Sequence, residues 1–352
     1  MKIFPRMARG IFHGFFFYVK FSGGGEGMKR AAKNAARRTL GFVLALLLLS
    51  LAVFYLSRLS PGDPLRSYYG ESAERLSESE RADALDRLGL DRPIIVQYGV
   101  WLKNALRGDF GVSFQYKRDV MTVIGGVYGN TLLLGVTAYL STFGLALLLG
   151  AFCALREDSP ADRAVRRIGT VTGCIPSFWL ALLLILLFSV ELGLLPSSGA
   201  YDIGRPNDLL GRLRHLILPL AVLVLGHLWY YACLIRNRLL DEVRQDYVLL
   251  CRAEGLSRRK ILFTQCLRNV LPSYFGLMAV SIPHILGGTY IVEKVFSYPG
   301  LGTLCFESAK YHDYNMLLVL CLITGAVVML AGMAARALGG ALDPRMRGRG
   351  AR

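Results

Sequence analysis

The stretch LLDEVRQDYVLLCRAEGLSRRKILFTQCLRNVLP, residues 239–272, decides the fold, because it places a charged hairpin between two long apolar runs. Gly255 is a natural helix stop and Ser257 is a natural cap for a following helix. The pattern therefore predicts two short helices that meet at residues 253–257. Each flanking run is long enough to cross a bilayer. We interpret the hairpin as a loop that joins two membrane spans.

Two details of the hairpin predict that it works at an interface. In its first helix, Val243, Tyr247 and Leu250 recur at helical spacing and predict one apolar stripe. The second helix begins with three basic residues at 258–260, where the helix dipole favours anions by roughly 0.3–1 kcal/mol per charge. Lipid phosphates or an acidic groove on a partner protein would compensate these charges.

Composition excludes an ordinary soluble protein. The 352 residues are 53% hydrophobic, the mean hydropathy is +0.42, and the apolar residues are gathered in long runs. The net charge of +16 does not indicate nucleic-acid binding, because the basic residues crowd between apolar runs and no basic and aromatic binding module accompanies them. The seven cysteines form no Cys-x-x-Cys pair, which predicts neither a disulfide framework nor a zinc site.

The apolar runs predict an all-α polytopic membrane protein with six transmembrane helices. The predicted spans are residues 39–59, 131–155, 168–192, 216–235, 274–292 and 316–338, with Pro176 expected to kink the third. The remaining parts are a basic segment at 1–38, a long loop at 60–130, a core at 131–338 that contains the hairpin, and a basic tail at 339–352. Within the long loop we expect helices at about 71–88 and 94–106.

Basic residues mark one side of the predicted bundle. They are dense in the N-terminal segment, the loop at 156–167, the hairpin and the tail. The positive-inside rule therefore predicts cytoplasmic termini, a cytoplasmic hairpin and an external loop at 60–130 in a plasma membrane. Met28 follows the run GGGEG, which has the composition of a translated ribosome-binding site, so Met28 rather than Met1 is our hypothesis for the native start.

The sequence offers no catalytic machinery of its own. No G-x-x-x-x-G-K-[ST] motif occurs, and there is no Gly-Lys dipeptide, so an ordinary phosphate-binding loop cannot form. Metalloprotease H-E-x-x-H and hydrolase G-x-S-x-G patterns are also absent. We predict no catalytic residues, no metal site and no cofactor, and any ATP energy must come from another subunit.

Several motifs give the chain a resemblance to a known family. The hairpin reads DY at 246–247, RAEGLS at 252–257 and RNVLP at 268–272. The further matching stretches are SPGDP at 60–64, LGLDRP at 88–93, GDFG at 108–111, IPSFW at 175–179, HLILP at 215–219, EKVFSYPGLG at 293–302 and LDPR at 342–345. From about Arg37 onward the chain resembles a permease subunit of the binding-protein-dependent ABC importers for dipeptides, oligopeptides and nickel.

The resemblance implies both the partners and the coupling residues. It implies two ABC ATPase subunits, a homologous second permease and an extracytoplasmic substrate-binding protein around a permease for short peptides. The hairpin would be the coupling helix that docks on an ATPase. The residues expected to do this are Asp246, Tyr247, Arg252, Ala253, Glu254, Gly255, Leu256, Ser257 and Arg258. Cys251 and Glu254 depart from the alanine and lysine common in the family.

The translocation path is predicted in the fourth and fifth spans. His227 and His284 are ionisable groups in apolar runs, and such groups usually face a bundle interior or a cavity. A neutral histidine bonded to a neighbouring helix is the alternative interpretation. Gly287 and Gly288 are candidates for a pore-lining or flexing position. Glu293, at the end of the fifth span, is explained by snorkelling or by pairing with its neighbour Lys294.

Three other functions remain as alternatives. Nickel or a metal chelate is the close alternative substrate, because imidazole is a suitable transient metal ligand. A secondary transporter would need inverted repeats and buried acidic coupling sites, and neither is visible in the sequence. An intramembrane enzyme would need a constellation of nucleophile, base or metal ligands within the spans. Copurification with an ATPase would distinguish an ABC importer from a secondary transporter and from an intramembrane enzyme.

Overall fold

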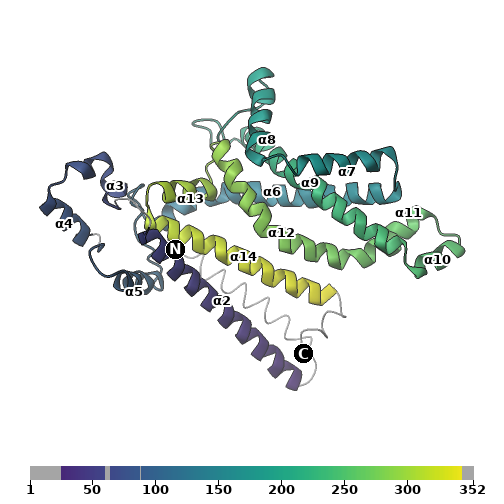
Figure 1. The fold of residues 1–352 in the computed structure, drawn as a ribbon, viewed down its shortest axis with the longest axis horizontal. Coiled ribbons are helices and arrows are strands. Elements are labelled where there is room, and N and C mark those ends of the chain that lie inside the picture. Colours follow the sequence, from purple (N-terminus) through teal and green to yellow (C-terminus); the bar gives the residue numbers. More distant parts are fainter. Residues whose placement is uncertain (1–24, 60–63, 88, 343–352) are drawn as a thin grey trace.

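The computed structural model describes residues 25–59, 64–87 and 89–342 of the chain, and helices make up its regular structure (Figure 1). The long helices are α2 (Gly25–Leu59), α6 (Val120–Leu155), α9 (Leu209–Val243), α12 (Leu267–Val295) and α14 (Tyr314–Leu342). Within the described residues, no strand forms, and the only bridge is an isolated one between Val112 and Asp119. The predicted all-α class is confirmed.

Shorter helices fill the two ends of the bundle. Those of the long loop and the sixth-span entrance are α3 (Pro64–Tyr69), α4 (Glu78–Arg87), α5 (Ile94–Ala105) and α13 (Leu301–Lys310). Those around the hairpin are α10 (Asp246–Ala253) and α11 (Arg258–Ile261). Figure 1 shows the two groups at opposite ends, which we call the flap end (α3, α4, α5, α13) and the hairpin end (α10, α11).

The number of membrane spans depends on two bent helix pairs. Among the described residues, four helices are long and apolar enough to cross a membrane, and there are six candidates if each bent pair counts as one span. The first pair is α7 (Pro160–Thr172) with the segment Ser177–Glu191, which meet at 105°. The second pair bends by 42° between Ile285 and Gly287. The six-span prediction agrees with the larger count.

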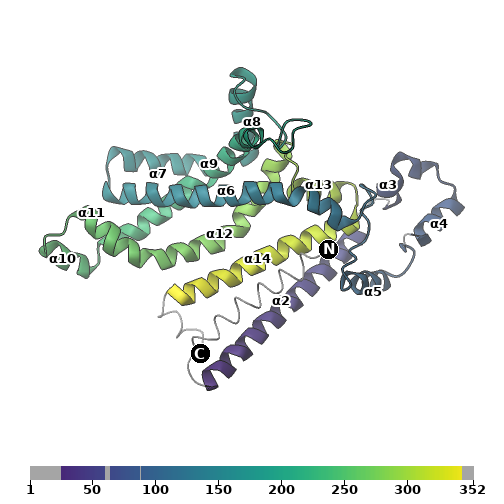
Figure 2. The ribbon, with the colours of Figure 1, turned by 180° about the vertical axis from the view of Figure 1, so that it is seen from behind.

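The break in the third span is sharper than the predicted kink. α7 ends at Thr172, and α8 (Ser177–Leu184) begins after Pro176, which cannot donate a backbone hydrogen bond. A π-helical segment, Ile185–Glu191, continues α8. Figures 1 and 2 show α8 projecting away from the long helices.

The helix boundaries extend beyond the predicted apolar cores. α6 begins at Val120, inside the segment predicted as loop, because the Asp119 carboxylate accepts a hydrogen bond from the Thr122 amide and caps the helix. α2 begins at Gly25, well before the predicted start at residue 39. The hypothesis that Met28 rather than Met1 is the native start concerns residues before Gly25, which lie outside the described residues.

The core lies where α6, α9 and α12 meet. α6 and α9 pack along each other, α12 packs on both, and α14 lies between α12 and α2 (Figure 2). Phe143, Tyr231, Ile235, Leu262 and Ile285 are among the buried side chains of this core. Helices that are apolar on most faces, such as α6, expose their remaining apolar surface, as membrane helices do.

Candidate functional site

The hairpin end contains the predicted coupling residues. Its turn has the predicted glycine stop and serine cap. Gly255 adopts a φ of +80°, a left-handed conformation that favours glycine. Its amide donates to the Arg252 carbonyl at 2.9 Å and closes α10. The Ser257 hydroxyl accepts from the Lys260 amide at 3.4 Å, so the predicted cap of the second helix is confirmed.

The predicted apolar stripe of the first hairpin helix is wrong. Val243 is the last residue of α9, and the backbone turns at Arg244 before α10 begins, so Val243 does not share a helix with Tyr247. The inward residue of α10 is Val248, which is 1% exposed, whereas Leu250 is 63% exposed. The boundary falls at residue 244 because the fourth span continues as a helix through its polar end.

The nine predicted coupling residues lie at the surface. All nine are exposed except Tyr247 and Leu256, which are half-buried. The neighbouring Leu249 is 62% exposed and projects with Leu250 from α10. Two large apolar side chains side by side on a charged surface are typical of a protein interface.

A polar brace holds the two arms of the hairpin together. The Tyr247 hydroxyl donates to the Glu242 carboxylate at 2.9 Å, and the Asn269 side-chain amide donates to the same oxygen at 2.9 Å. Burial raises the pKa of Tyr247, and its hydrogen bonds to the Cys266 sulfur and to Glu242 raise it further. The hydroxyl therefore stays protonated and keeps its proton to donate.

Two arginines tie the hairpin to the end of α6. Arg258 donates to the Ala154 carbonyl at 3.1 Å, and Arg244 pairs with Glu157 at 2.7 Å. Arg258 thus finds a carbonyl partner within the chain, whereas the predicted compensation came from outside. A cavity of about 580 Å³ lies here, lined by Arg244, Glu157 and Arg258 together with Val243, Gln245, Leu249 and Arg252.

A buried ion pair fixes the helix that leads into the hairpin. The Arg236 guanidinium of α9 donates through Nε and Nη2 to the two carboxylate oxygens of Asp162 in α7, both at 2.5 Å. The Asp162 side chain is completely buried, and the Asp158 amide also donates to it. Removing either charge would leave the other buried and unpaired, which is costly. The sequence analysis missed this pair because its members are 74 residues apart.

The two predicted path histidines lie against each other. The rings of His227 and His284 are 5.1 Å apart at 85°. The Leu223 carbonyl can only accept, so His227 Nδ1 donates to it at 2.8 Å, within its own helix. A Cβ placed on Gly288 would lie 3.4 Å from the His227 ring, and Gly287 faces open space. The structure therefore gathers the four predicted path residues at the bend of the fifth span.

The flap end contains a buried carboxylate whose role the sequence analysis misjudged. Glu293 is 0% exposed, and its carboxylate accepts from the Thr131 hydroxyl at 2.7 Å and from the Gly302 amide at 2.7 Å. Lys294 instead pairs with Glu307 at 3.3 Å, so the predicted pairing between neighbours is wrong. A side chain on Gly302 would collide with Tyr290 and Glu293. The EKVFSYPGLG stretch thus folds around the Glu293 carboxylate.

The arrangement defines a helical membrane protein with a braced polar hairpin at one end, and the family comparisons agree with it. The family described as "binding-protein-dependent transport system inner membrane component" matches residues 146–348. The N-terminal component of the same transport systems matches residues 32–135. The chain belongs to this family.

Two relatives within the family match most of the chain. The chain is 32% identical to the oligopeptide transport system permease protein AppB of Bacillus subtilis (strain 168) over 311 residues, 88% of this chain and 98% of the relative. It is also 32% identical to the di/tripeptide transport system permease protein DppB of Pseudomonas aeruginosa (strain UCBPP-PA14), over 85% of this chain and 94% of the relative.

A solved structure supports the fold. Inward-facing structures of the MetNI methionine ABC transporter match with TM-scores of 0.50 and 0.51 at 19% and 21% identity. Each match covers 63% of this chain and 97% of the other chain. At these identities, the match shows that the two proteins share a helical fold.

Proposed function

We propose that this chain is a permease subunit of an ATP-driven importer for short peptides in a bacterial plasma membrane. One observation carries the proposal: the hairpin is braced internally by Tyr247, Glu242 and Asn269, while its tip exposes Leu249 and Leu250. A rigid element with an unpartnered apolar tip is suited to receive force from another protein. Two cytoplasmic ATPase subunits supply that force.

Peptides are the proposed cargo. Relatives that match nearly the whole chain are named for oligopeptides and for di- and tripeptides. Within the described residues, no group of three or more histidine, cysteine, aspartate or glutamate side chains is arranged to hold a metal ion. The His227–His284 pair offers two imidazoles, and we assign these to the peptide path.

The hairpin works as a lever in this proposal. α9 leads into it and α11 leads out of it toward α12, so a push on α10 tilts the fourth and fifth spans together. The Asp162–Arg236 pair carries the motion of α9 to α7. The bend at Gly287, beside His284, lets the distal part of the fifth span follow at a different angle.

The orientation and the remaining partners complete the assembly. The hairpin end and both termini face the cytoplasm, in accordance with the distribution of basic residues. The flap end faces outward and receives peptide from an extracytoplasmic substrate-binding protein. A homologous second permease forms the other half of the path, beside the exposed His284 and Gly287.

Substituting Gly255 with valine tests the lever. The left-handed backbone at Gly255 is strained for any other residue, by roughly 1–2 kcal/mol, and no atom lies near its missing Cβ. We expect the Gly255→Val complex to insert normally but to lose peptide uptake. Gly204→Val is the matched control, because Gly204 has a φ of +81° and open space at the other end of the molecule. Normal uptake by Gly255→Val would contradict the lever.

A further inference from the structure

Two cysteines of neighbouring helices lie against each other at the flap end. Cys305 belongs to α13 and Cys321 to the first half of α14, and their side chains share a hydrogen bond. Both are free thiols, and both are partly exposed. The sequence gives no sign of this thiol pair, because its members lie on different helices and form no Cys-x-x-Cys motif.

The contacts of Tyr290 place both cysteines independently of the bond between them. A Cβ on Gly302 would lie 2.6 Å from the Tyr290 ring, and the Tyr290 hydroxyl lies 2.7 Å from the Thr324 hydroxyl. Gly302 is one turn before Cys305 in α13. Thr324 is one turn after Cys321 in α14. Because residues one turn apart share a helix face, both cysteines lie on the faces that meet Tyr290, and its side chain interacts electrostatically with both thiols.

The turn between α13 and α14 fixes the two helices relative to each other. The Asp313 amide donates to the Ser308 carbonyl at 2.9 Å, and the Tyr311 amide donates to the Glu307 carbonyl at 2.9 Å. The Asp313 carboxylate is buried and accepts from the Gln115 amide at 3.2 Å. The turn therefore holds the thiols side by side, which is the condition for a bond between them without a large backbone movement.

Other cysteines of the chain are placed differently. Cys153 and Cys266 are completely buried. Cys174 is exposed, and its thiol donates to the Thr170 carbonyl at 3.5 Å. The thiol pair of α13 and α14 differs from these three because it combines partial exposure with an adjacent thiol.

We propose that Cys305 and Cys321 are a redox-active pair, which a small-molecule disulfide in the extracytoplasmic compartment oxidises to a disulfide that latches α13 to α14. The inference rests on the proposed function, which places the flap end outside the membrane. Disulfides form and persist in extracytoplasmic compartments, whereas cytosolic thiols stay reduced.

The reaction is a thiol–disulfide exchange in two steps. The Cys305 thiolate, on the shorter helix, attacks one sulfur of the oxidant R–S–S–R, forms a mixed disulfide and releases the first RS⁻. The Cys321 thiolate then attacks the Cys305 sulfur, forms the bond between the two cysteines and releases the second RS⁻. The two protons lost by the cysteines convert both leaving groups to RSH. Two cysteine thiols are thus oxidised while one small-molecule disulfide is reduced.

The latch acts on the fifth span. The Gly302 and Thr303 amides of α13 donate to the Glu293 carboxylate of α12 at 2.7 and 3.3 Å. A disulfide from α13 to α14 therefore connects the end of α12 to α14 through α13. The lever requires the part of α12 beyond its bend to change its angle, so the oxidised complex should import peptide more slowly than the reduced complex.

Mass spectrometry tests the bond. Oxidised glutathione, which is charged and does not cross the membrane, is added to spheroplasts that carry the wild-type complex, and the remaining thiols are alkylated after denaturation. Trypsin cleaves after Lys310, between the two cysteines, so a disulfide-linked pair of peptides identifies the bond. We expect this linked pair in wild type and its absence in Cys305→Ser and Cys321→Ser.

Peptide uptake by the same spheroplasts, supplied with the binding protein, tests the latch. We expect the oxidant to slow wild-type uptake roughly threefold or more, and dithiothreitol to restore it. Cys321→Ser should import at the reduced wild-type rate with and without the oxidant. Cys174→Ser, which removes an exposed thiol elsewhere, should respond as wild type does.

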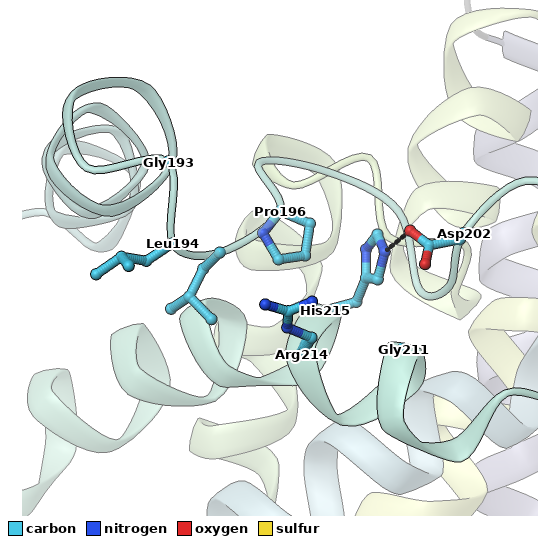
Figure 3. A pocket seen from close by; sticks show the side chains of 8 residues that line it. Gly193, Leu194, Pro196, Asp202, Gly211, Arg214 and His215 are labelled. Atoms are coloured by element: carbon cyan, nitrogen blue, oxygen red, sulfur yellow. Dashed lines mark hydrogen bonds and ion pairs between the residues drawn. The ribbon is translucent and has the colours of Figure 1, made fainter.

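A second contact at the flap end provides a control without thiols. Figure 3 shows His215 of α9 facing Asp202 of the preceding loop, and His215 Nε2 lies 3.1 Å from the Asp202 carboxylate. No cysteine lines the adjacent pocket of about 270 Å³. Asp202→Asn weakens this contact and leaves the thiol pair intact, so its uptake should keep the full response to the oxidant.

The outcomes separate the inference from the proposed function. A wild-type chain without the linked peptides, or with glutathione on Cys305 and no crosslink, would overturn the redox-active pair. A crosslink that leaves uptake unchanged, or a slowing that persists in Cys321→Ser, would overturn the latch. If the reduced wild-type complex imports no peptide, the proposed function fails and the latch fails with it, while the linked peptides would still confirm the bond.

Discussion

The hairpin and the Glu293 cluster lie at opposite ends of the bundle and use polar groups in opposite ways. At the flap end, the Glu293 carboxylate is buried and accepts hydrogen bonds from Thr131, Gly302 and Thr303. At the hairpin end, most of the predicted coupling residues are exposed, and Leu249 and Leu250 face solvent. A buried carboxylate whose hydrogen bonds are all made stabilises the folded chain, whereas exposed apolar side chains are available to a partner protein. The comparison therefore separates residues needed for folding from residues that we propose are needed for coupling.

The largest expected effect on stability comes from the Asp162–Arg236 pair. Asp162→Ala leaves Arg236 buried without its partner, which costs about 3–5 kcal/mol. Thermal unfolding of the detergent-solubilised protein, followed with a thiol-reactive dye, measures the loss. Asp158→Asn is the control, because it removes the charge of the exposed Asp158–Arg166 pair, which is of a kind that contributes about 0–1 kcal/mol, while asparagine tolerates the left-handed backbone at position 158. Equal shifts in Tm for the two variants would contradict a structural role for the buried pair.

Glu293→Gln should have the next largest effect. The substitution keeps the size of the side chain but replaces one acceptor oxygen with an NH2 group. This group can only donate, and the groups around it, Thr131, Gly302 and Thr303, are themselves donors to the carboxylate. We expect a loss of about 1–3 kcal/mol in the same unfolding experiment. Glu191→Gln, at an exposed position, should leave the Tm unchanged. A Tm of wild-type value in Glu293→Gln would show that the cluster is not a folding element.

Tyr247→Phe should cost less, about 0.5–1.5 kcal/mol, because the bonds of its single hydroxyl to Glu242 and to the Cys266 sulfur are lost while the Asn269 amide still donates to Glu242. The raised pKa of Tyr247 adds a pH dependence. The folded state holds the proton more tightly than the unfolded chain, so this stability is complete below the ordinary tyrosine pKa of roughly 10. It is lost as the pH rises above that value toward the folded pKa. Unfolding between pH 8 and 11 should therefore show a steeper alkaline decline in wild type than in Tyr247→Phe, and parallel declines would contradict the brace.

The double substitution Leu249→Asp and Leu250→Asp should have the smallest effect on stability, within about 0.5 kcal/mol, as is usual for exposed positions. Peptide uptake should nevertheless be lost, because the tip no longer matches an apolar partner surface. Uptake and Tm measured on the same preparation check both expectations. Val248→Asp is the contrasting control, since Val248 is buried and its substitution should lower the Tm. Retained uptake in the double variant would show that Leu249 and Leu250 do not belong to the surface that contacts the ATPase.

The sequence predicted most of the fold because local signals decide it. Gly255 and Ser257 mark the hairpin turn by their own backbone chemistry, and the apolar runs locate the helices. The ends of the helices were less predictable, because α9 continues through polar residues to Val243 without an apolar signal. α13 was missed since its ten residues follow a turn motif and carry no membrane-length run.

The contacts that fix the candidate sites were beyond sequence reasoning. Asp162 and Arg236 meet only after α7 folds back on α9, and Glu293 finds Thr131 from a helix 162 residues away. A single sequence does not reveal which distant partner satisfies a buried charge. The histidine pair is an intermediate case: both residues were predicted for one path, and the fold placed their rings 5.1 Å apart.

The most direct test of the central proposal is site-specific photo-crosslinking from position 250 in the purified transporter. A photoreactive amino acid in place of Leu250 should give a covalent adduct with an ATPase subunit, and the same probe at Ile203 should give none. An adduct from position 203 with no adduct from position 250, or labelling of position 250 from outside intact cells, would contradict the assignment of the hairpin as the cytoplasmic coupling element.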